Sequence, residues 1–127
     1  MSLTDRVSPV AAVPAADPDV AARHFAARLA VETDCADVAV DVRAGEVPYT
    51  IVDVRGPGSY ADGHVPGALN VPSSSIDADV AAGLPDGLIV VYCWGPGCNG
   101  AHRAAAALVS LAELPTQRSP PARVAEA

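Results

Sequence analysis

Apolar and polar positions follow two different periods along the chain, and the change of period separates helices from strands. Apolar side chains recur at helical spacing over Pro18–Glu32, after an Asp-Pro pair that is typical of a helix start. A second, shorter helical pattern begins at Asp34 or Asp37 and ends before Gly45. The β-branched run Tyr49–Arg55, bounded by proline and glycine, predicts a buried strand.

The second half of the chain repeats this alternation around its most apolar run. Leu88–Cys93 predicts another buried strand, and a glycine-bearing loop leads from it to an alanine-rich helix that starts at Gly100 and ends near Glu113. The shorter expected elements are a helical turn in Gly58–His64, a strand at Ala68–Val71 and a small helix over Asp79–Ala82. Alternating strands and helices indicate an α/β domain with a small, mainly parallel sheet flanked by helices.

The 127 residues suit one domain, because a chain of this size rarely divides further. We expect a flexible arm over residues 1–16, the domain over 17–114 and an irregular tail over 115–127 with room for one short strand at Thr116–Arg118. The arm has no charged-then-apolar leader and no apolar run long enough to cross a membrane.

Composition predicts a core of small side chains. Half of the residues are hydrophobic but only 4% are aromatic, so we expect alanine and valine to pack around a few aromatic anchors. These anchors are Phe25, Tyr49, Tyr60, Tyr92 and Trp94.

Charge and cysteine count narrow the possible partners and compartments. A net charge of −7 without any lysine argues against nucleic-acid binding, which needs clustered cations. Three cysteines form an odd set that does not suit a secreted disulfide framework. A cytoplasmic protein that contacts neither nucleic acid nor membrane is the expectation.

Cys93 comes at the carboxyl end of a predicted parallel strand, where ligands gather in such sheets. A thiol there faces the free amides of the following helix, which favours the thiolate, and Gly95 and Gly97 allow loop amides to turn inward. The alternative is that Cys93 only closes the strand as a small apolar residue. A pair of cysteines with His102 nearby falls short of four zinc ligands, so no metal is expected.

Two segments carry a family resemblance. "IVDVRGPGSYADGHVPGALNVP" followed by "VVYCWGPGCNGAHRAA" resembles the rhodanese-homology domain, with its Asp-x-Arg strand end, its Gly-His-x-Pro-Gly-Ala turn and its Tyr-Cys strand end. The resemblance covers about Asp17 to Leu114, and the loop is similar to that of small single-domain members with Cys-Trp-Gly-Pro-x-Cys-Asn.

The resemblance implies a thiosulfate sulfurtransferase-like enzyme without a cofactor. The loop cysteine would attack the outer sulfur of a small anion such as thiosulfate, hold it as a persulfide and pass it to cyanide or a thiol. Counting from the strand puts Cys93 in this position, whereas counting back from Arg103 puts Cys98 there. We favour Cys93, and Cys98 then either resolves the persulfide into a disulfide or merely lines the loop.

The resemblance and the position of the loop also suggest roles for the remaining residues. The expected substrate-binding set is Arg55, Trp94, Gly95, Gly97, Cys98, Asn99 and Arg103. Arg55 either extends its planar, rigid guanidinium to the loop or forms a surface ion pair. Arg103 either points toward the entrance of the loop or is solvated. Asp53 is expected to support neighbouring turns, His64 to order its own turn, and Cys35 to serve packing.

The chain also departs from the family pattern after Leu114. The usual final strand, Gly-Gly turn and Trp-bearing helix are not recognisable, so the C-terminal elements look shortened and an apolar flank of the sheet would be covered by the N-terminal arm or by a second copy in a homodimer. Two non-enzymatic alternatives follow. One is a rhodanese-like module that binds an anion or a partner, and the other is a sulfide or redox sensor that uses Cys93 and Cys98.

Overall fold

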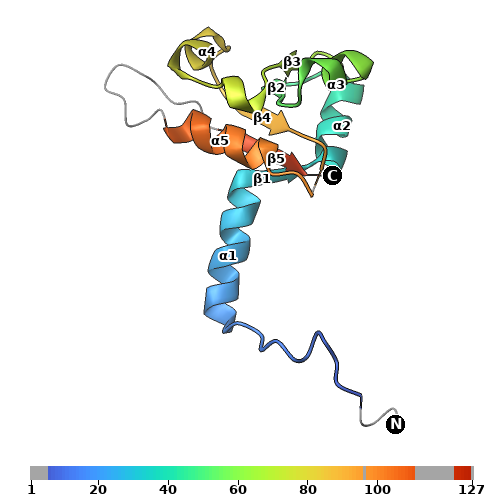
Figure 1. Cartoon of the computed structure of the whole chain (residues 1–127), viewed down its shortest axis with the longest axis vertical. Helices are drawn as coiled ribbons and strands as arrows, with labels where there is room; N and C mark the ends of the chain where they lie inside the picture. Colours follow the sequence, from blue (N-terminus) through green and yellow to red (C-terminus); the bar gives the residue numbers. More distant parts are fainter. Residues whose placement is uncertain (1–5, 96, 111–121, 127) are drawn as a thin grey trace.

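The computed structural model describes residues 6–95, 97–110 and 122–126. Its elements, in chain order, are α1 (Pro18–Val31), β1 (Glu32–Asp34), α2 (Cys35–Ala44), β2 (Thr50–Asp53), α3 (Pro57–Asp62), β3 (Leu69–Asn70), the 3₁₀ turn η2 (Ser73–Ser75), α4 (Ala78–Gly83), β4 (Ile89–Tyr92), α5 (Gly100–Ser110) and β5 (Ala122–Glu126). Figure 1 shows them in the order of the chain.

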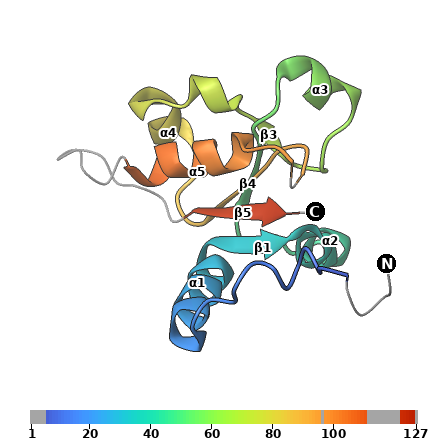
Figure 2. The ribbon, with the colours of Figure 1, turned by 60° about the horizontal axis from the view of Figure 1, so that its bottom comes forward.

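The strands form one five-stranded sheet in the order β1-β5-β4-β2-β3, and every pairing is parallel. Figure 2 shows α5 on one side of this sheet and α2 on the other. The predicted α/β class with a parallel sheet is therefore confirmed. Because parallel strands end at the same edge, the ends of β2 and β4 are brought side by side, with Asp53 opposite Tyr92.

The sequence predicted an irregular C-terminal tail, and the described part of this tail contradicts that prediction. Ala122–Glu126 forms β5, which inserts between β1 and β4 rather than remaining irregular, so the last strand of the sheet is present. Val124 is buried in the core on one face of this strand. The strand expected at Thr116–Arg118 lies outside the described residues.

A short strand, β1, separates helix α1 from helix α2, and local sequence signals mark both ends of α2. α1 stops at Val31, and Glu32–Asp34 forms the edge strand β1, which the helical pattern concealed. The Asp34 side chain accepts a hydrogen bond from the Asp37 N–H and caps α2. Gly45 ends α2 in the left-handed conformation, with φ of 76°.

The core consists of aliphatic side chains on both faces of the sheet. Ile89, Val91 and Leu108 belong to the cluster under α5, whereas Val38 and Val90 belong to the cluster under α2. The prediction of aromatic anchors is wrong for Phe25 and Trp94, which are 59% and 69% exposed. The three tyrosines are only partly buried.

Helix α1 stands apart from this core. None of its residues is buried, and Figure 1 shows it projecting from the sheet with the N-terminal segment running farther away. The described residues 6–16 are almost all exposed, so they do not cover the flank of the sheet. Among the described helices, none is both long and apolar enough to cross a membrane.

Candidate functional site

Cys93 follows β4 directly and begins the loop that leads into α5. Successive side chains of a strand point to opposite faces, so Tyr92 lies on the α2 side while Cys93 packs against the core on the α5 side. The Cys93 side chain is half-buried. This position at the carboxyl end of the sheet agrees with the prediction for the loop.

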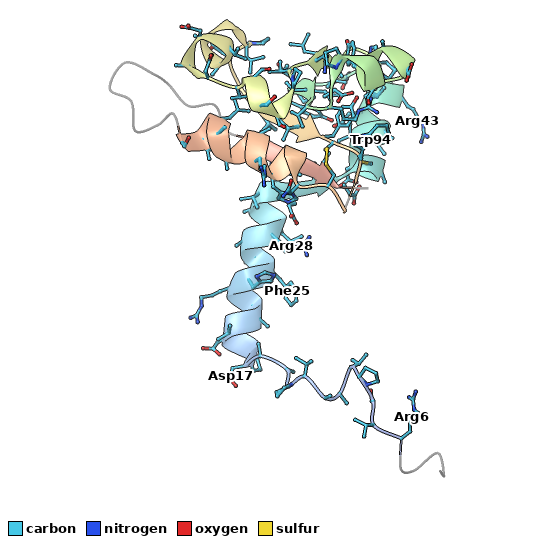
Figure 3. The ribbon with its side chains drawn as sticks, in the orientation of Figure 1. Arg6, Asp17, Phe25, Arg28, Arg43 and Trp94 are labelled. Carbon is cyan, nitrogen blue, oxygen red and sulfur yellow. A yellow bond between two sulfur atoms is a disulfide. The ribbon has the colours of Figure 1, made fainter. Side chains whose placement is uncertain are left out.

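Cys93 and Cys98 form a disulfide, with their Cα atoms 6.5 Å apart. Figure 3 shows the sulfur–sulfur bond beside the labelled Trp94. The loop turns back because the Cys98 N–H donates to the Gly95 carbonyl over 2.9 Å. Gly95 has a φ of 140°, a conformation that other residues rarely adopt, so glycine is required there.

Gly100, the first residue of α5, lies against the sulfur pair. A Cβ at this position would be 3.0 Å from the Cys93 Sγ and 3.5 Å from the Cys98 Sγ. The Gly100 N–H itself donates to the Cys98 Sγ at 3.5 Å. The sulfurs therefore face the amide end of an 11-residue helix, where partial positive charge favours a thiolate or a bound anion.

The mouth of the loop is an open hollow of about 270 Å³ lined by Trp94, Gly95, Gly97 and Cys98. Asn99 is exposed beside it, and its carbonyl accepts the Arg103 N–H at 3.0 Å. Five of the predicted substrate-binding residues thus belong to this loop, and Cys98 is one of them. The hollow opens to solvent and has Cys98 in its wall.

Asp53 supports the site from the end of β2. Its side chain is fully buried and accepts hydrogen bonds from the Arg55 backbone N–H (2.9 Å), the Arg55 Nη2 (2.7 Å) and the Tyr92 hydroxyl (2.8 Å). Burial alone raises the pKa of Asp53, but these hydrogen bonds outweigh it and the pKa lies below its ordinary value. The expected supporting role of Asp53 is confirmed.

Arg55 links this buried carboxylate to the loop. Its Nη2 also donates to the Gly63 carbonyl at 2.6 Å, and its guanidinium lies 4.6 Å from the centre of the Trp94 ring. The hydrogen bond to Asp53 raises the pKa of Arg55. The Arg55 side chain is only 9% exposed and is held by protein groups, which favours a positioning role over direct contact with an anion.

The turn after α3 is ordered as expected. The His64 ring stacks on Tyr60 with centroids 3.6 Å apart, and its Nδ1 lies 2.8 Å from the Tyr60 carbonyl oxygen. The Tyr92 hydroxyl also accepts the Val65 N–H at 3.1 Å, which ties this turn to β4. His64 therefore orders its turn, as its sequence position predicted.

The remaining candidates are exposed at the surface. Arg103 is exposed on the first turn of α5, and His102 lies 3.1 Å from a carboxylate oxygen of Glu32. Hydrogen bonds from Arg28 and then His102 lower the pKa of Glu32. Cys35 is exposed at the start of α2, so the prediction that it serves packing is wrong.

A separate apolar cavity of about 260 Å³ lies under α2, on the face of the sheet opposite the Cys93 thiol, with Val38, Val90 and Tyr92 in its wall. Within the described residues, no group of three or more histidine, cysteine or acidic side chains is placed to hold a metal ion.

Sequence reasoning missed two features of the site. The first is the Tyr92 hydroxyl, which reaches Asp53 across two strands. The second is Gly100, whose missing side chain leaves room for both sulfurs. A signal for Tyr92 was available, because it precedes the strand-end cysteine and must point to the face opposite the thiol. For Gly100, the signal in the sequence was limited to its position at the start of a predicted helix.

Comparisons with known proteins agree with this geometry. Residues 33–117 match the family described as the rhodanese-like domain. The crystal structure of a Bacillus halodurans protein is similar, with a TM-score of 0.73, 34% identity and coverage of 87% of this chain and 76% of that chain. The solution structure of the rhodanese-like domain of an Anabaena protein has a TM-score of 0.55 and 26% identity, over 75% of this chain and 65% of that one.

One curated relative is much longer than the region of similarity. An HTH-type transcriptional regulator of Mycobacterium tuberculosis is 46% identical over 55 residues, which are 43% of this chain and 24% of the regulator. The matched part thus spans about a quarter of that protein.

Proposed function

Because this chain belongs to the rhodanese-like domain family, we propose that it is a sulfurtransferase that carries sulfane sulfur on Cys93. The observation that carries the proposal is the placement of the Cys93 sulfur at the end of β4, against the first residue of an 11-residue helix. The donor is a small sulfur-containing anion such as thiosulfate, and the acceptor is cyanide or a thiol.

The reaction begins once the disulfide is reduced. The Cys93 thiolate attacks the outer sulfur of thiosulfate, the bond between the two sulfur atoms of thiosulfate breaks, and sulfite leaves with the electron pair. The persulfide that remains carries negative charge, which the amide end of α5 and the amides of the glycine loop stabilise. Transfer to cyanide then gives thiocyanate and restores the thiolate.

The residues around the sulfurs have separate roles in this proposal. Gly95, Gly97, Cys98 and Asn99 supply the loop in which the anion is held, and Trp94 forms its outer wall. Arg103, exposed one turn into α5, attracts the anion by charge, which matters in a protein with a net charge of −7.

Arg55 acts indirectly in this proposal, through Trp94, because its guanidinium is already bound to Asp53 and Gly63. The cytoplasm is the proposed compartment, because thiols stay reduced there.

A second candidate is a thiol-based sensor or a non-catalytic binding module. The pairing of Cys93 with Cys98 favours it, since a reversible disulfide beside an anion hollow reports sulfur species or oxidants. The similarity to an HTH-type transcriptional regulator over 55 residues is a further argument for a regulatory role. In that case sulfur binding would alter a partner's activity without turnover.

An assay of thiocyanate formation from thiosulfate and cyanide distinguishes the sulfurtransferase from the second candidate function. We expect the reduced wild type and Cys35→Ser to form thiocyanate catalytically, and Cys93→Ser to form none. The Cys98→Ser variant should retain activity, because Cys93 alone carries the sulfur. Activity that survives in Cys93→Ser but is lost in Cys98→Ser would reassign the carrier, and the absence of turnover in all four proteins would favour the sensor.

A further inference from the structure

The two loop sulfurs are near enough to react with each other as well as with substrate. Cys93 and Cys98 are bonded, and their separation in the chain is only five residues. The third cysteine, Cys35, is at the start of α2, and α2 covers the opposite face of the sheet. Any internal thiol that meets a persulfide on Cys93 is therefore Cys98.

We infer that Cys98 removes the sulfur from the Cys93 persulfide as hydrogen sulfide, which makes this chain a dithiol-dependent thiosulfate reductase as well as a transferase. The inference rests on the proposed function, since it needs Cys93 as the sulfur carrier. It adds a product, sulfide, and a required co-substrate, a reducing dithiol.

The step balances without an external oxidant. The Cys98 thiol loses its proton and attacks the inner sulfur, which is the Cys93 Sγ. The bond between Cys93 and the outer sulfur breaks, and the electron pair leaves with the outer sulfur. That sulfur takes up the proton and departs as hydrosulfide. The sulfane sulfur is reduced by two electrons while the two thiols are oxidised to the disulfide. A dithiol then reduces the disulfide by exchange and restores both thiols.

Gly100 supports this chemistry by its size and its amide. Its N–H donates to the Cys98 Sγ, which favours the attacking thiolate. A Cβ at this position would be 3.0 Å from the Cys93 Sγ, so an alanine would occupy space that the sulfurs use when they meet. The hollow beside Trp94 and Cys98 gives the departing sulfide a path to solvent.

The test loads the persulfide without relying on thiosulfate turnover. Reduced Cys35→Ser and Cys35→Ser/Cys98→Ser proteins are treated briefly with inorganic polysulfide and desalted. Intact mass and released sulfide are then followed over time. In Cys35→Ser we expect the disulfide, seen as the loss of two hydrogens, with one sulfide released per chain. The variant that also lacks Cys98 should keep one added sulfur atom and release no sulfide.

Two measurements distinguish failure of the inference about Cys98 from failure of the proposed function. A stable persulfide on Cys93 with Cys98 present, and equal sulfide release from the two proteins, would each overturn the inference. A separate single-turnover mixture with thiosulfate measures sulfite. If sulfite does not form, then the proposed donor reaction fails, whereas the polysulfide result still decides the role of Cys98. If sulfite forms and sulfide does not, then only the inference fails.

Discussion

Replacement of Arg55 by methionine tests whether the buried Asp53 carboxylate depends on its partner. Methionine keeps most of the length of the side chain but removes the guanidinium. Asp53 is fully buried, and the guanidinium contacts both of its carboxylate oxygens, at 3.0 Å and 2.7 Å. Among the described residues, the donors left after the substitution would be the Tyr92 hydroxyl and the backbone N–H of residue 55.

The expected loss is large for a domain of this size. Removing one partner of a buried ion pair leaves an uncompensated charge and costs about 3–5 kcal/mol. A domain has roughly 5–15 kcal/mol of unfolding free energy in total, so the variant loses a large fraction of it. At about 4 °C per kcal/mol, the melting temperature should fall by roughly 12–20 °C.

Thermal and urea unfolding followed by circular dichroism measure this loss. The matched control is Arg23→Met on the exposed face of α1, which should stay within about 0.5 kcal/mol of the wild type. The double variant Asp53→Asn/Arg55→Met should lose less than the sum of the single variants, because no buried charge is left alone. A loss below about 1 kcal/mol in Arg55→Met, or strict additivity in the double variant, would refute the reasoning.

Four further predictions follow from named contacts. Gly100→Ala should slow closure of the disulfide by a reagent such as oxidised glutathione, because its Cβ would crowd the Cys93 sulfur; closure at the wild-type rate would contradict the packing. Trp94 is the single tryptophan, so its fluorescence should rise when the neighbouring disulfide, an efficient quencher, is reduced; an unchanged spectrum would place the ring elsewhere. Leu108→Ala should cost about 2–5 kcal/mol in urea unfolding, since Leu108 is fully buried, whereas Val109→Ala on the exposed face should cost far less. The pKa of Asp53 is lowered from 3.8, so the stability that its carboxylate contributes to the fold is complete above that pH and is lost as the pH falls through the folded value. Asp53→Asn should therefore show a shallower decline in stability than the wild type from about pH 4 downward. An identical decline in the two proteins would contradict the shift.

Local patterns predicted the elements that build the site. The β-branched run before Asp53 and the apolar run before Cys93 are both strands, because each of them is long and apolar enough to be buried on both faces. The helix after Gly100 begins where expected and is described as far as Ser110. The family motifs lie on these elements, so the sequence also indicated the neighbourhood of Cys93.

Long-range pairing escaped the same patterns. β5 is a five-residue strand after a proline-rich stretch, and its membership in the sheet depends on the gap between β1 and β4. β1 has only three residues, too few for a period to be recognised. Phe25 suggested an anchor because it is aromatic, yet α1 projects from the domain and leaves it exposed.

The sequence by itself therefore determined the α/β class, the glycine loop and the presence of two thiols in it, because these depend on residues close together in the chain. Only the tertiary structure decided what those residues contact. Asp53 and Tyr92 are separated by 39 positions but share a hydrogen bond, since parallel β2 and β4 end at one edge. The bond between Cys93 and Cys98 depends likewise on how the loop folds back over Gly100, where the absence of a side chain leaves space for both sulfurs.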